Sequence, residues 1–349
     1  MLSECCFVWN HALALQKRYY KLYGKLISLS DIKKHFAKRV KRNLLHSQTV
    51  QEILERLDTS YKRFFKRISK RPPKFKRREE FSSFVFKFPK GFKLNGNTIR
   101  INRIDKVFKF SLSRKYDGDI KQVRFKRLKN NRYHLFIVTD KKPDTIGKSR
   151  RGASVGIDFG LKQYLTLSDG KKYDNPLFFK KHINDIRLAN RRLSRAKRGS
   201  NNRKKRLFEL NQIYYRIGNA RNDFQWKLAH ELCRSYGTIF IEDLNIEAMR
   251  RLWGRKISDL SHSSFINKLI YIASKYGVKV HKIDRFYPSS KTCECGYIHK
   301  GLSLKDRTWE CPNCHKINDR DLLASNNILR RGIYELEREG NSKRLVPPA

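Results

Sequence analysis

The sequence predicts a mixed fold, with a helical part first, an all-β part second and an α/β domain in the larger C-terminal part. Three observations lead to this fold class. Apolar residues recur with helical spacing up to about residue 70, and alternate with polar residues over 81–145. From residue 153, short apolar strands are separated by helical patterns.

The first 70 residues are expected to form helices. Phe7, His11, Leu15, Tyr19 and Leu22 share one helical stripe, and a second apolar stripe runs through SQTVQEILERLDTSYKRFF. Residues 62–78 then hold ten Lys and Arg in seventeen positions, with phenylalanines interleaved. This segment is expected to be a basic linker that contacts nucleic acid.

Residues 81–145 alternate in period two. The stretches SSFVFKF, TIRINRI, VFKFSLS, KQVRFKRL and RYHLFIVTD are separated by Gly, Asn and Asp turns. Five or so short strands of this kind predict a small barrel or sandwich.

The α/β pattern begins with ASVGIDFG and QYLTLSDGKKY, which are expected to be two adjacent strands. A basic helical hairpin is expected over 176–233, with Leu207, Leu210 and Tyr214 on its apolar stripe. TIFIEDL and VKVHKID are predicted as buried strands with a helix around 263–276 between them.

The chain is strongly basic: 80 Lys and Arg against 32 Asp and Glu give a net charge of +48 over 349 residues. Such a charge opposes compaction unless a polyanion neutralises it, so nucleic acid is the expected partner. A membrane is not expected, since no apolar run reaches about 18 residues. No signal peptide is visible, which favours a reducing, cytoplasmic location on nucleic acid.

Two acidic residues end predicted strands. Asp158 shares its strand face with Gly156 and Gly160, which leaves room for a metal and a phosphate. Glu242 ends TIFIE in the same way. Open α/β sheets place their sites at such strand ends.

A third acid comes from the stretch NDRDLLASNNIL. Asp319 is expected to cap a helix, while Asp321 lies inside it with small residues at the following turn, so Asp321 is the predicted third ligand. Hard carboxylate oxygens suit Mg²⁺ or Mn²⁺, and two such ions about 3.5–4 Å apart can cleave a phosphodiester. The sequence therefore predicts a metal-dependent nuclease site.

The cysteines fall into two classes. Cys5, Cys6 and Cys233 lie in apolar helical contexts and are expected in the core. The other four come as two close pairs that predict a structural Zn²⁺ site, with His299 or His315 as alternative ligands; these four are Cys293, Cys295, Cys311 and Cys314.

The ordered motifs together resemble the TnpB (OrfB) family of transposon-encoded RNA-guided nucleases, which is related to compact type V CRISPR effectors. GIDFG resembles its first RuvC motif, IEDLN the second and NDRDLLASNNI the third. SSKTCECGYIH with DRTWECPNC resembles its zinc ribbon, and CCFVWNHAL with RLDTSYKRFF its recognition helices.

The resemblance implies an RNase H-like RuvC domain (153–285 and 318–335) with an inserted zinc ribbon (286–317). A β-barrel wedge domain (71–145) and a helical recognition lobe (1–70) precede it, and 336–349 is expected to be a disordered tail. By position, the metal triad is Asp158, Glu242 and Asp321, and Gln51 faces the duplex of a short motif beside the target. The other expected nucleic-acid contacts are basic: Lys62, Arg63, Lys66, Arg67, Arg191, Arg192, Lys204 and Lys205.

The resemblance also implies a guide RNA from the transposon end and a DNA target that is cut by one RuvC site. Three departures leave alternatives open. Leu323 and Ser325 replace the usual Asn and Ala, the Cys293–Cys295 knuckle is one residue short, and the strand that usually precedes CCFVWN is not seen. One alternative is an RNA-guided DNA-binding protein that cuts weakly or not at all and acts by occlusion. Another is a structure-specific nuclease without a guide.

Overall fold

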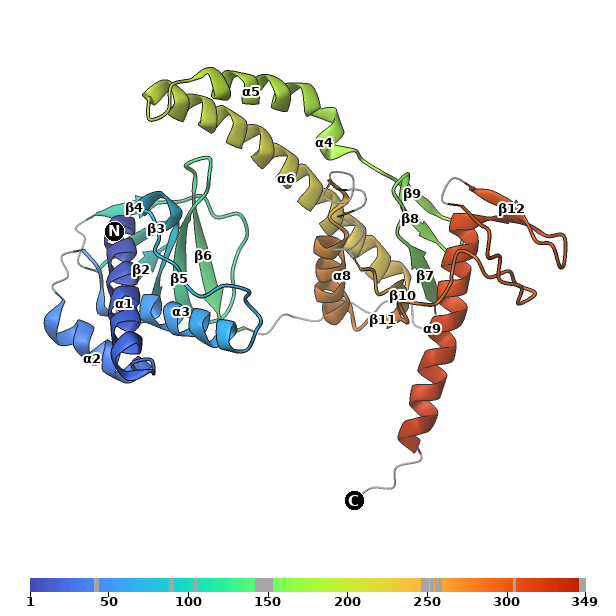
Figure 1. The fold of residues 1–349 in the computed structure, drawn as a ribbon, viewed down its shortest axis with the longest axis horizontal. Helices are drawn as coiled ribbons and strands as arrows, with labels where there is room; N and C mark the ends of the chain where they lie inside the picture. The colour runs from blue at the N-terminus through green and yellow to red at the C-terminus, as the bar shows by residue number, and fades with distance from the viewer. Residues whose placement is uncertain are drawn as a thin grey trace. The chain divides into compact units, whose positions relative to one another are not determined.

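The computed structural model describes residues 1–40, 44–87, 91–102, 106–141, 153–245, 251, 254, 259–303 and 306–344, with side chains up to residue 338. The chain forms two compact units, Met1–Lys142 and Pro143–Ala349 (Figure 1). The stretch KKPDTIGKSRRGA, which the sequence predicts to be a linker, lies outside the described residues over 142–152. Each unit is described by itself.

The first unit begins with the helices α1 (Leu2–Tyr23), α2 (Leu29–Arg39) and α3 (Ser47–Phe65). The predicted apolar stripe of α1 is wrong, because Phe7 is 56% exposed and Leu22 is 65% exposed. The buried face instead carries Cys5, Trp9 and Leu13. The Trp9 indole N–H donates to a backbone carbonyl 65 residues further along the chain, and this hydrogen bond fixes the buried face. The spacing of apolar residues within the helix cannot predict a contact with so distant a residue.

Two antiparallel three-stranded sheets complete the described part of this unit. One has the order β1-β5-β6 and the other β2-β3-β4. Helices and strands share one hydrophobic cluster, in which Leu13 and Ile53 lie with Phe86 and Val123. Closure of the sheets into a barrel stays a prediction. The strand bounds are Ser83–Lys87 (β1), Phe92–Asn95 (β2), Thr98–Ile101 (β3), Val107–Lys109 (β4), Ile120–Arg127 (β5) and Tyr133–Thr139 (β6), with a short 3₁₀ helix η1 at Arg78–Glu80.

The second unit is built on a five-stranded mixed sheet with the order β11-β10-β7-β8-β9. Strand β10 runs parallel to both β7 and β11, whereas β8 is antiparallel to β7. The predicted α/β architecture of this part is thereby confirmed. The strand bounds are Ser154–Asp158 (β7), Gln163–Leu167 (β8), Lys172–Asp174 (β9), Thr238–Glu242 (β10) and Lys279–Ile283 (β11).

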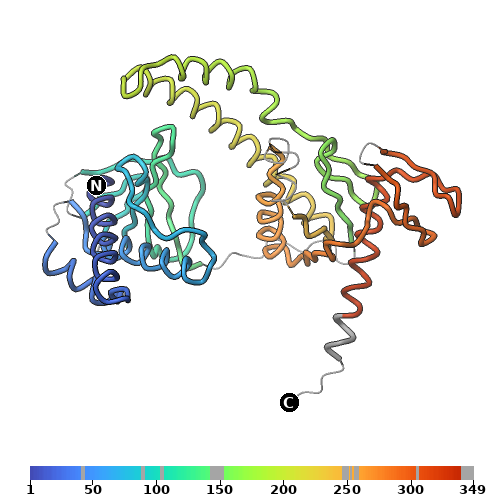
Figure 2. The backbone as a smooth tube through the Cα atoms, in the orientation of Figure 1, coloured from blue at the N-terminus to red at the C-terminus, as the bar shows by residue number. Residues whose placement is uncertain are grey.

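Helices cover both faces of this sheet (Figure 1). On one face, helices α6 (Asn201–Ser235) and α8 (His262–Tyr276) pack against Val155, Ile239 and Ile241. The other face, which includes Phe240, packs against α9 (Arg320–Arg344). Figure 2 shows α5 (Ile183–Arg195), which follows the short helix α4 (Phe178–Lys181), running beside the first half of α6 as an antiparallel hairpin.

The hairpin buries only part of its predicted stripe. Leu210 and Ile217 are buried together with Ile186 of α5. Leu207 and Tyr214 are instead 46% and 44% exposed. Since the first half of α6 packs against a single helix, only a narrow stripe is covered there.

Helix α9 lies against the sheet at two glycines. A Cβ atom on Gly156 of β7 would come 2.1 Å from the Ser325 carbonyl oxygen, and one on Gly332 of α9 would come 2.0 Å from the Phe240 ring. Both distances are far below van der Waals contact, so the close approach of helix and sheet requires glycine at each position.

The predicted disordered tail is wrong for residues 336–344, because α9 continues to Arg344. Leu336 packs beside Phe240 and Ile283, and Glu335 pairs with Arg331 and His281. The partial burial of Leu336 and the ion pair between Arg331 and Glu335, one helical turn apart, stabilise this extension of the helix. Residues 345–349 lie outside the described range.

Between β11 and α9 the chain forms a small separate layer. It holds the hairpin β12 (Thr308–Glu310) and β13 (Ile317–Asp319), and its core is Cys293, Leu302, Trp309, Cys311 and Leu323. Within the described part of the chain, the structure contains no helix long and apolar enough to cross a membrane.

Candidate active site and cysteine cluster

Three carboxylates from distant parts of the chain line one cavity of about 570 Å³. Asp158 ends β7, Glu242 ends β10 and Asp321 lies in the first turn of α9. Because β7 and β10 are parallel neighbours, their carboxyl ends meet at the same edge of the sheet. The structure thus brings together all three acids that the sequence predicted as ligands.

These carboxylates repel one another and are poorly hydrated. Burial raises the pKa of Asp158 to about 8, and the charges of Glu242 and Asp321 add to that shift. Burial also raises the pKa of Glu242. Such a site favours a bound proton or a bound cation, because either relieves the repulsion. Carboxylate oxygens are the ligands that Mg²⁺ and Mn²⁺ prefer, so the residues present fit such an ion.

Asp319 serves a different purpose from Asp321. Its Oδ1 accepts hydrogen bonds from the backbone N–H groups of Asp321 and Leu322, at 3.0 and 3.1 Å. Its Oδ2 accepts one from Lys172 Nζ at 2.8 Å. Asp319 is therefore the cap of α9, as predicted, and its side chain is occupied away from the cavity.

Basic side chains surround the acids. Arg285, Lys291, Arg307 and Arg320 line the same cavity. Arg307 Nη1 lies 3.0 and 3.3 Å from the two carboxylate oxygens of Asp321. A cation that binds Asp321 has to displace or reorient this guanidinium. Of the other basic groups, Arg285 pairs with Asp243, and Arg320 Nη1 donates to the Ser303 carbonyl oxygen at 2.7 Å.

The four predicted cysteines form one cluster, in which the Sγ atoms all lie within 4.8 Å of one another. Cys293 and Cys314 Sγ are 3.6 Å apart, as are Cys295 and Cys311 Sγ. Four ligand sulfurs around Zn²⁺, each at about 2.3 Å, have nearly this spacing, so the cluster fits tetrahedral zinc. The missing residue in the first knuckle does not prevent convergence, since Gly296 turns the chain there with φ = 90°.

A neighbouring amide favours thiolate at one of the four cysteines. Asn313 Nδ2 lies 3.5 Å from Cys295 Sγ, and its hydrogen bond lowers the pKa of that thiol to about 6. The histidines considered as substitutes lie elsewhere: His315 pairs with Glu310 at 3.0 Å, and the His299 ring packs edge-on against Trp309. Four cysteines are thus the ligand set that the described residues provide.

The remaining cysteines and Leu323 are core residues. Cys5, Cys6 and Cys233 are at most 3% exposed, which confirms the sequence prediction. Leu323 packs against Cys293, Cys311 and Trp309 beneath the cluster and does not line the cavity of the carboxylates. Leu323 stands where the TnpB (OrfB) family, which the motifs resemble, usually has Asn. Its apolar side chain joins α9 to the cysteine layer.

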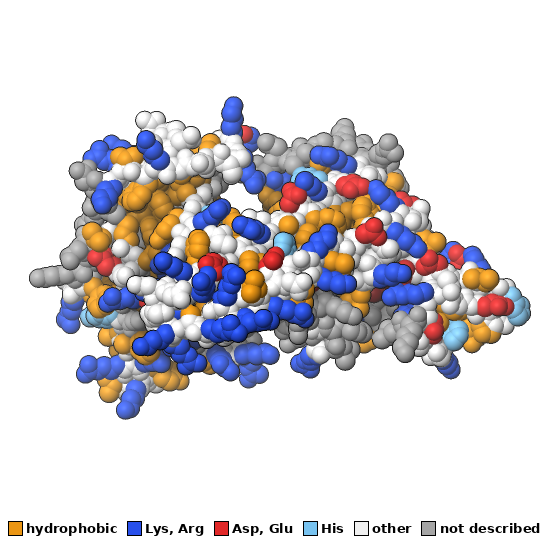
Figure 3. Space-filling view, turned by 90° about the horizontal axis from the view of Figure 1, so that it is seen from above, with side chains coloured by type: hydrophobic (Ala, Val, Ile, Leu, Met, Phe, Trp, Pro, Cys, Tyr) orange, Lys and Arg blue, Asp and Glu red, His pale blue; other side chains and the backbone are white. Residues whose placement is uncertain are grey.

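All nine predicted nucleic-acid contacts are exposed on the surface. Gln51 lies in α3, four basic residues lie at or just after its C-terminal end, two lie in α5 and two in α6. Figure 3 shows Lys and Arg side chains spread over the visible face of the chain, with few acids among them. The nine residues are Gln51, Lys62, Arg63, Lys66, Arg67, Arg191, Arg192, Lys204 and Lys205.

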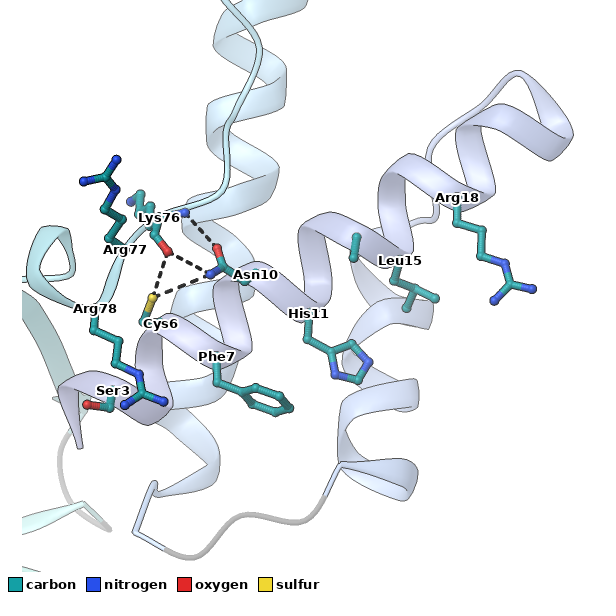
Figure 4. Close-up of a pocket in the computed structure, with 11 residues that line it drawn as sticks. Ser3, Cys6, Phe7, Asn10, His11, Leu15, Arg18, Lys76, Arg77 and Arg78 are labelled. Carbon is teal, nitrogen blue, oxygen red and sulfur yellow. Dashed lines mark hydrogen bonds between the residues drawn. The ribbon is translucent and has the colours of Figure 1, made fainter.

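The basic segment 62–78 connects α3 to η1 and β1, and it packs against α1. Its first residues form the end of α3. The side chain of Asn10 in α1 accepts a hydrogen bond from the Lys76 backbone N–H and donates one to the Lys76 carbonyl oxygen, each at 2.8 Å (Figure 4). Lys76 Nζ also lies 3.7 Å from the centroid of the Trp9 ring. A groove of about 720 Å³ results, with Phe7 on one side and Arg77 and Arg78 on the other.

Sequence reasoning missed two residues at the cavity and one residue behind it. Ser289 donates a hydrogen bond to Glu242, Asn327 binds the turn that carries Ser289, and Arg307 binds Asp321. The sequence offers one weak signal, Asn327, an amide that stands directly before the apolar pair Ile328 and Leu329 in α9. Ser289 and Arg307 lie in loop-like stretches without periodicity.

The chain is similar to known proteins in sequence and in fold. The family model OrfB_IS605, described as "Probable transposase", matches residues 136–252, and the model "Cas12f1-like, TNB domain" matches 262–328. A solved structure titled "Cryo-EM structure of the Cas12f1-sgRNA-target DNA complex" is similar in fold, with a TM-score of 0.59 and 17% identity over 94% of this chain and 81% of that one.

Two relatives have informative names. A "Putative RNA-guided DNA endonuclease" of Streptomyces pristinaespiralis is 31% identical over 82% of this chain and 72% of its own length. The "Putative RNA-guided DNA endonuclease InsQ" of Escherichia coli (strain K12) is 26% identical over 95% of this chain and 87% of its own. With this similarity over most of both chains, and with the three motif carboxylates gathered in one cavity, the chain belongs to the TnpB (OrfB) family.

Proposed function

We propose that this protein is an RNA-guided DNA endonuclease that hydrolyses phosphodiester bonds at a single RuvC-type site. The observation that carries the proposal is the convergence of Asp158, Glu242 and Asp321 on one cavity in a chain of net charge +48. The many basic residues attract nucleic acid, and the few acids at this edge provide a place for Mg²⁺ or Mn²⁺. The names of the two relatives support the same activity.

At this site the divalent metal, when bound, polarises the scissile phosphate and lowers the pKa of a water nucleophile. Asp158, Glu242 and Asp321 would hold it through carboxylate oxygens. Arg285, Lys291 and Arg320 line the cavity, where they can bind the phosphates beside the scissile bond. Gly160 lines the cavity beside Asp158, whereas the bare face of Gly156 is covered by Ser325 and Leu329 of α9, so the room expected there for a phosphate is not available.

Zinc at the four cysteines is proposed to be structural. The Sγ atoms are close enough to complete a tetrahedral site, which leaves no open position for substrate. A hairpin as short as β12–β13 cannot bury a large core, so metal ligation supplies the stability that packing alone does not.

Guide RNA and target DNA are the proposed partners, with the guide derived from the transposon end and the target read beside a short motif. Gln51, exposed on α3, is proposed to read that motif. The eight exposed Lys and Arg residues named above are proposed to bind phosphates and to set the salt dependence of affinity.

The decisive experiment is expression of the chain with flanking transposon DNA, sequencing of the copurified RNA, and cleavage of a plasmid library in Mg²⁺. Asp158→Ala, Glu242→Ala and Asp321→Ala are each expected to abolish cleavage while RNA and target binding persist. Asp319→Asn is the matched control, because Asp319 caps the same helix and does not line the cavity. It is expected to cost about 0.5–2 kcal/mol of stability and to leave cleavage measurable.

Three results would contradict parts of the proposal. Target binding without cleavage in the parent protein would favour the occluding DNA-binding alternative. Cleavage of branched DNA without any copurified RNA would favour a guide-independent nuclease. Loss of cleavage in Asp319→Asn but not in Asp321→Ala would reverse the roles of those two residues.

A further inference from the structure

One hydroxyl group contacts the carboxylates of the cavity. Ser289 Oγ donates a hydrogen bond to Glu242 Oε1. Ser289 is 6% exposed, so water competes weakly for this bond. The other oxygen, Glu242 Oε2, has no hydrogen-bond partner among the residues that the structure describes. A carboxylate held through one oxygen in this way keeps the second free for a cation.

Ser289 is itself held by a side chain of α9. Asn327 Nδ2 donates to the carbonyl oxygen of Ser289 at 2.7 Å and to that of Thr292 at 2.6 Å. An amide nitrogen has two donors, and both are used here. Asn327 is 2% exposed, so the two bonds are made inside the protein. The turn 289–292 is therefore fixed to α9 at both of its ends.

The same turn leads into the cysteine cluster. Thr292 immediately precedes Cys293, and Asn318 Nδ2 lies 3.7 Å from Cys293 Sγ. Leu323 packs against Cys293 one helical turn before Asn327. Helix α9 thus contacts the carboxylate cavity through Asp321, the cysteine cluster through Leu323 and the turn 289–292 through Asn327.

We propose that Ser289 is a positioning residue that orients Glu242 for metal binding, that Asn327 holds Ser289 in place, and that the cysteine cluster supports the site through this turn. The inference rests on the proposed function, because it assigns a metal to Glu242. Groups that orient metal ligands from outside typically account for about 10–100-fold in metal affinity. An effect of that size is large enough to measure without any cleavage assay.

The test is titration of the zinc-loaded full chain with Mn²⁺, followed by electron paramagnetic resonance of the free ion in the absence of nucleic acid. Ser289→Ala is expected to weaken Mn²⁺ binding about 10–100-fold, with zinc content unchanged. Ser289→Thr keeps the hydroxyl and is expected to restore affinity. Asn327→Ala is expected to weaken binding in the same direction. Ser274→Ala is the control, since that exposed serine in α8 bonds only to the Tyr271 carbonyl and is expected to leave affinity unchanged.

The cluster is tested by Cys314→Ser, which is expected to release zinc and to weaken Mn²⁺ binding without further loss when combined with Ser289→Ala. Unchanged Mn²⁺ affinity in a folded, zinc-loaded Ser289→Ala variant would overturn the proposal. If that variant does not fold, Ser289→Cys is measured instead, because a thiol is close in size to the hydroxyl but donates only weakly. Unchanged Mn²⁺ affinity in Ser289→Cys would then overturn the proposal. Loss of affinity in Ser289→Thr equal to that in Ser289→Ala would also overturn it, because a hydroxyl would then not be what matters.

Asp158→Ala separates this inference from the proposed function. If Asp158→Ala abolishes Mn²⁺ binding and the Ser289 variants do not weaken it, only the inference fails. If Asp158→Ala leaves Mn²⁺ binding unchanged, the metal site of the proposed function fails as well.

Discussion

The approach of α9 to the sheet makes Gly156 the most sensitive position near the site. In Gly156→Ala, the added Cβ would lie 2.1 Å from the Ser325 carbonyl oxygen and 2.6 Å from the Leu329 backbone nitrogen. Ordinary contact begins at 3.4 Å, so the first separation has to grow by about 1.3 Å. Both obstacles are backbone atoms of a helix, and neither can move without moving α9.

The cost follows from that rigidity. Overpacking of a core by one methyl group typically costs about 1–3 kcal/mol, and a backbone clash lies at the upper end. For a unit of this size, about 3 kcal/mol corresponds to a fall in melting temperature of roughly 6–12 °C. Because Asp321 is carried by α9 and Asp158 by β7, the same shift is expected to separate two carboxylates of the cavity and to weaken Mn²⁺ binding.

Gly218→Ala is the matched control. Gly218 lies inside α6, and a Cβ there would meet no atom within 4 Å. Alanine in a helix interior is expected to stabilise by about 0.5–1 kcal/mol relative to glycine. Thermal unfolding of both variants by circular dichroism, with Mn²⁺ titration, is the assay. A Gly156→Ala protein that melts within 2 °C of the parent and binds Mn²⁺ normally would refute the reasoning.

Three further predictions follow from individual contacts. His262 is fully buried with neither ring nitrogen hydrogen-bonded, and burial lowers its pKa to about 4. The unfolded chain therefore takes up this proton first, and stability is lost as pH falls from about 6.5 toward 4, by about 2 kcal/mol at pH 5. His262→Leu should remove that part of the pH dependence in denaturant titrations, and an unchanged difference between pH 7 and pH 5 would contradict it. Arg307→Gln removes the half-exposed ion pair with Asp321 and should tighten Mn²⁺ binding about two- to fivefold, as for a pair worth about 0.5–1 kcal/mol; weaker binding would show that Arg307 supports the metal site. Metal analysis should find one zinc per chain, and none in Cys311→Ser, whereas a zinc-free parent would remove the ribbon interpretation.

The sequence by itself determined which acids and cysteines come together in the second unit. Asp158 and Glu242 stand at the ends of short apolar strands, and parallel pairing of such strands places their ends at one edge whatever the loops do. The cap at Asp319 was equally readable, because capping depends on the next three residues alone. The two cysteine pairs specify a cluster through their spacing. These features are local in sequence, so local patterns were sufficient to predict them.

The tertiary structure decided which partners these groups have. Phe7 is exposed because Trp9, bonded to a carbonyl 65 residues away, sets the buried face of α1. Ser289 and Arg307 contact carboxylates that lie 47 and 14 residues away in the chain, and both come from the segment between β11 and α9. Leu323 is buried because it packs against Cys293, Cys311 and Trp309 of the cysteine layer. Each of these contacts joins elements that the chain brings together only when the whole unit packs, and hydrophobic periodicity records which face is apolar but not what will cover it.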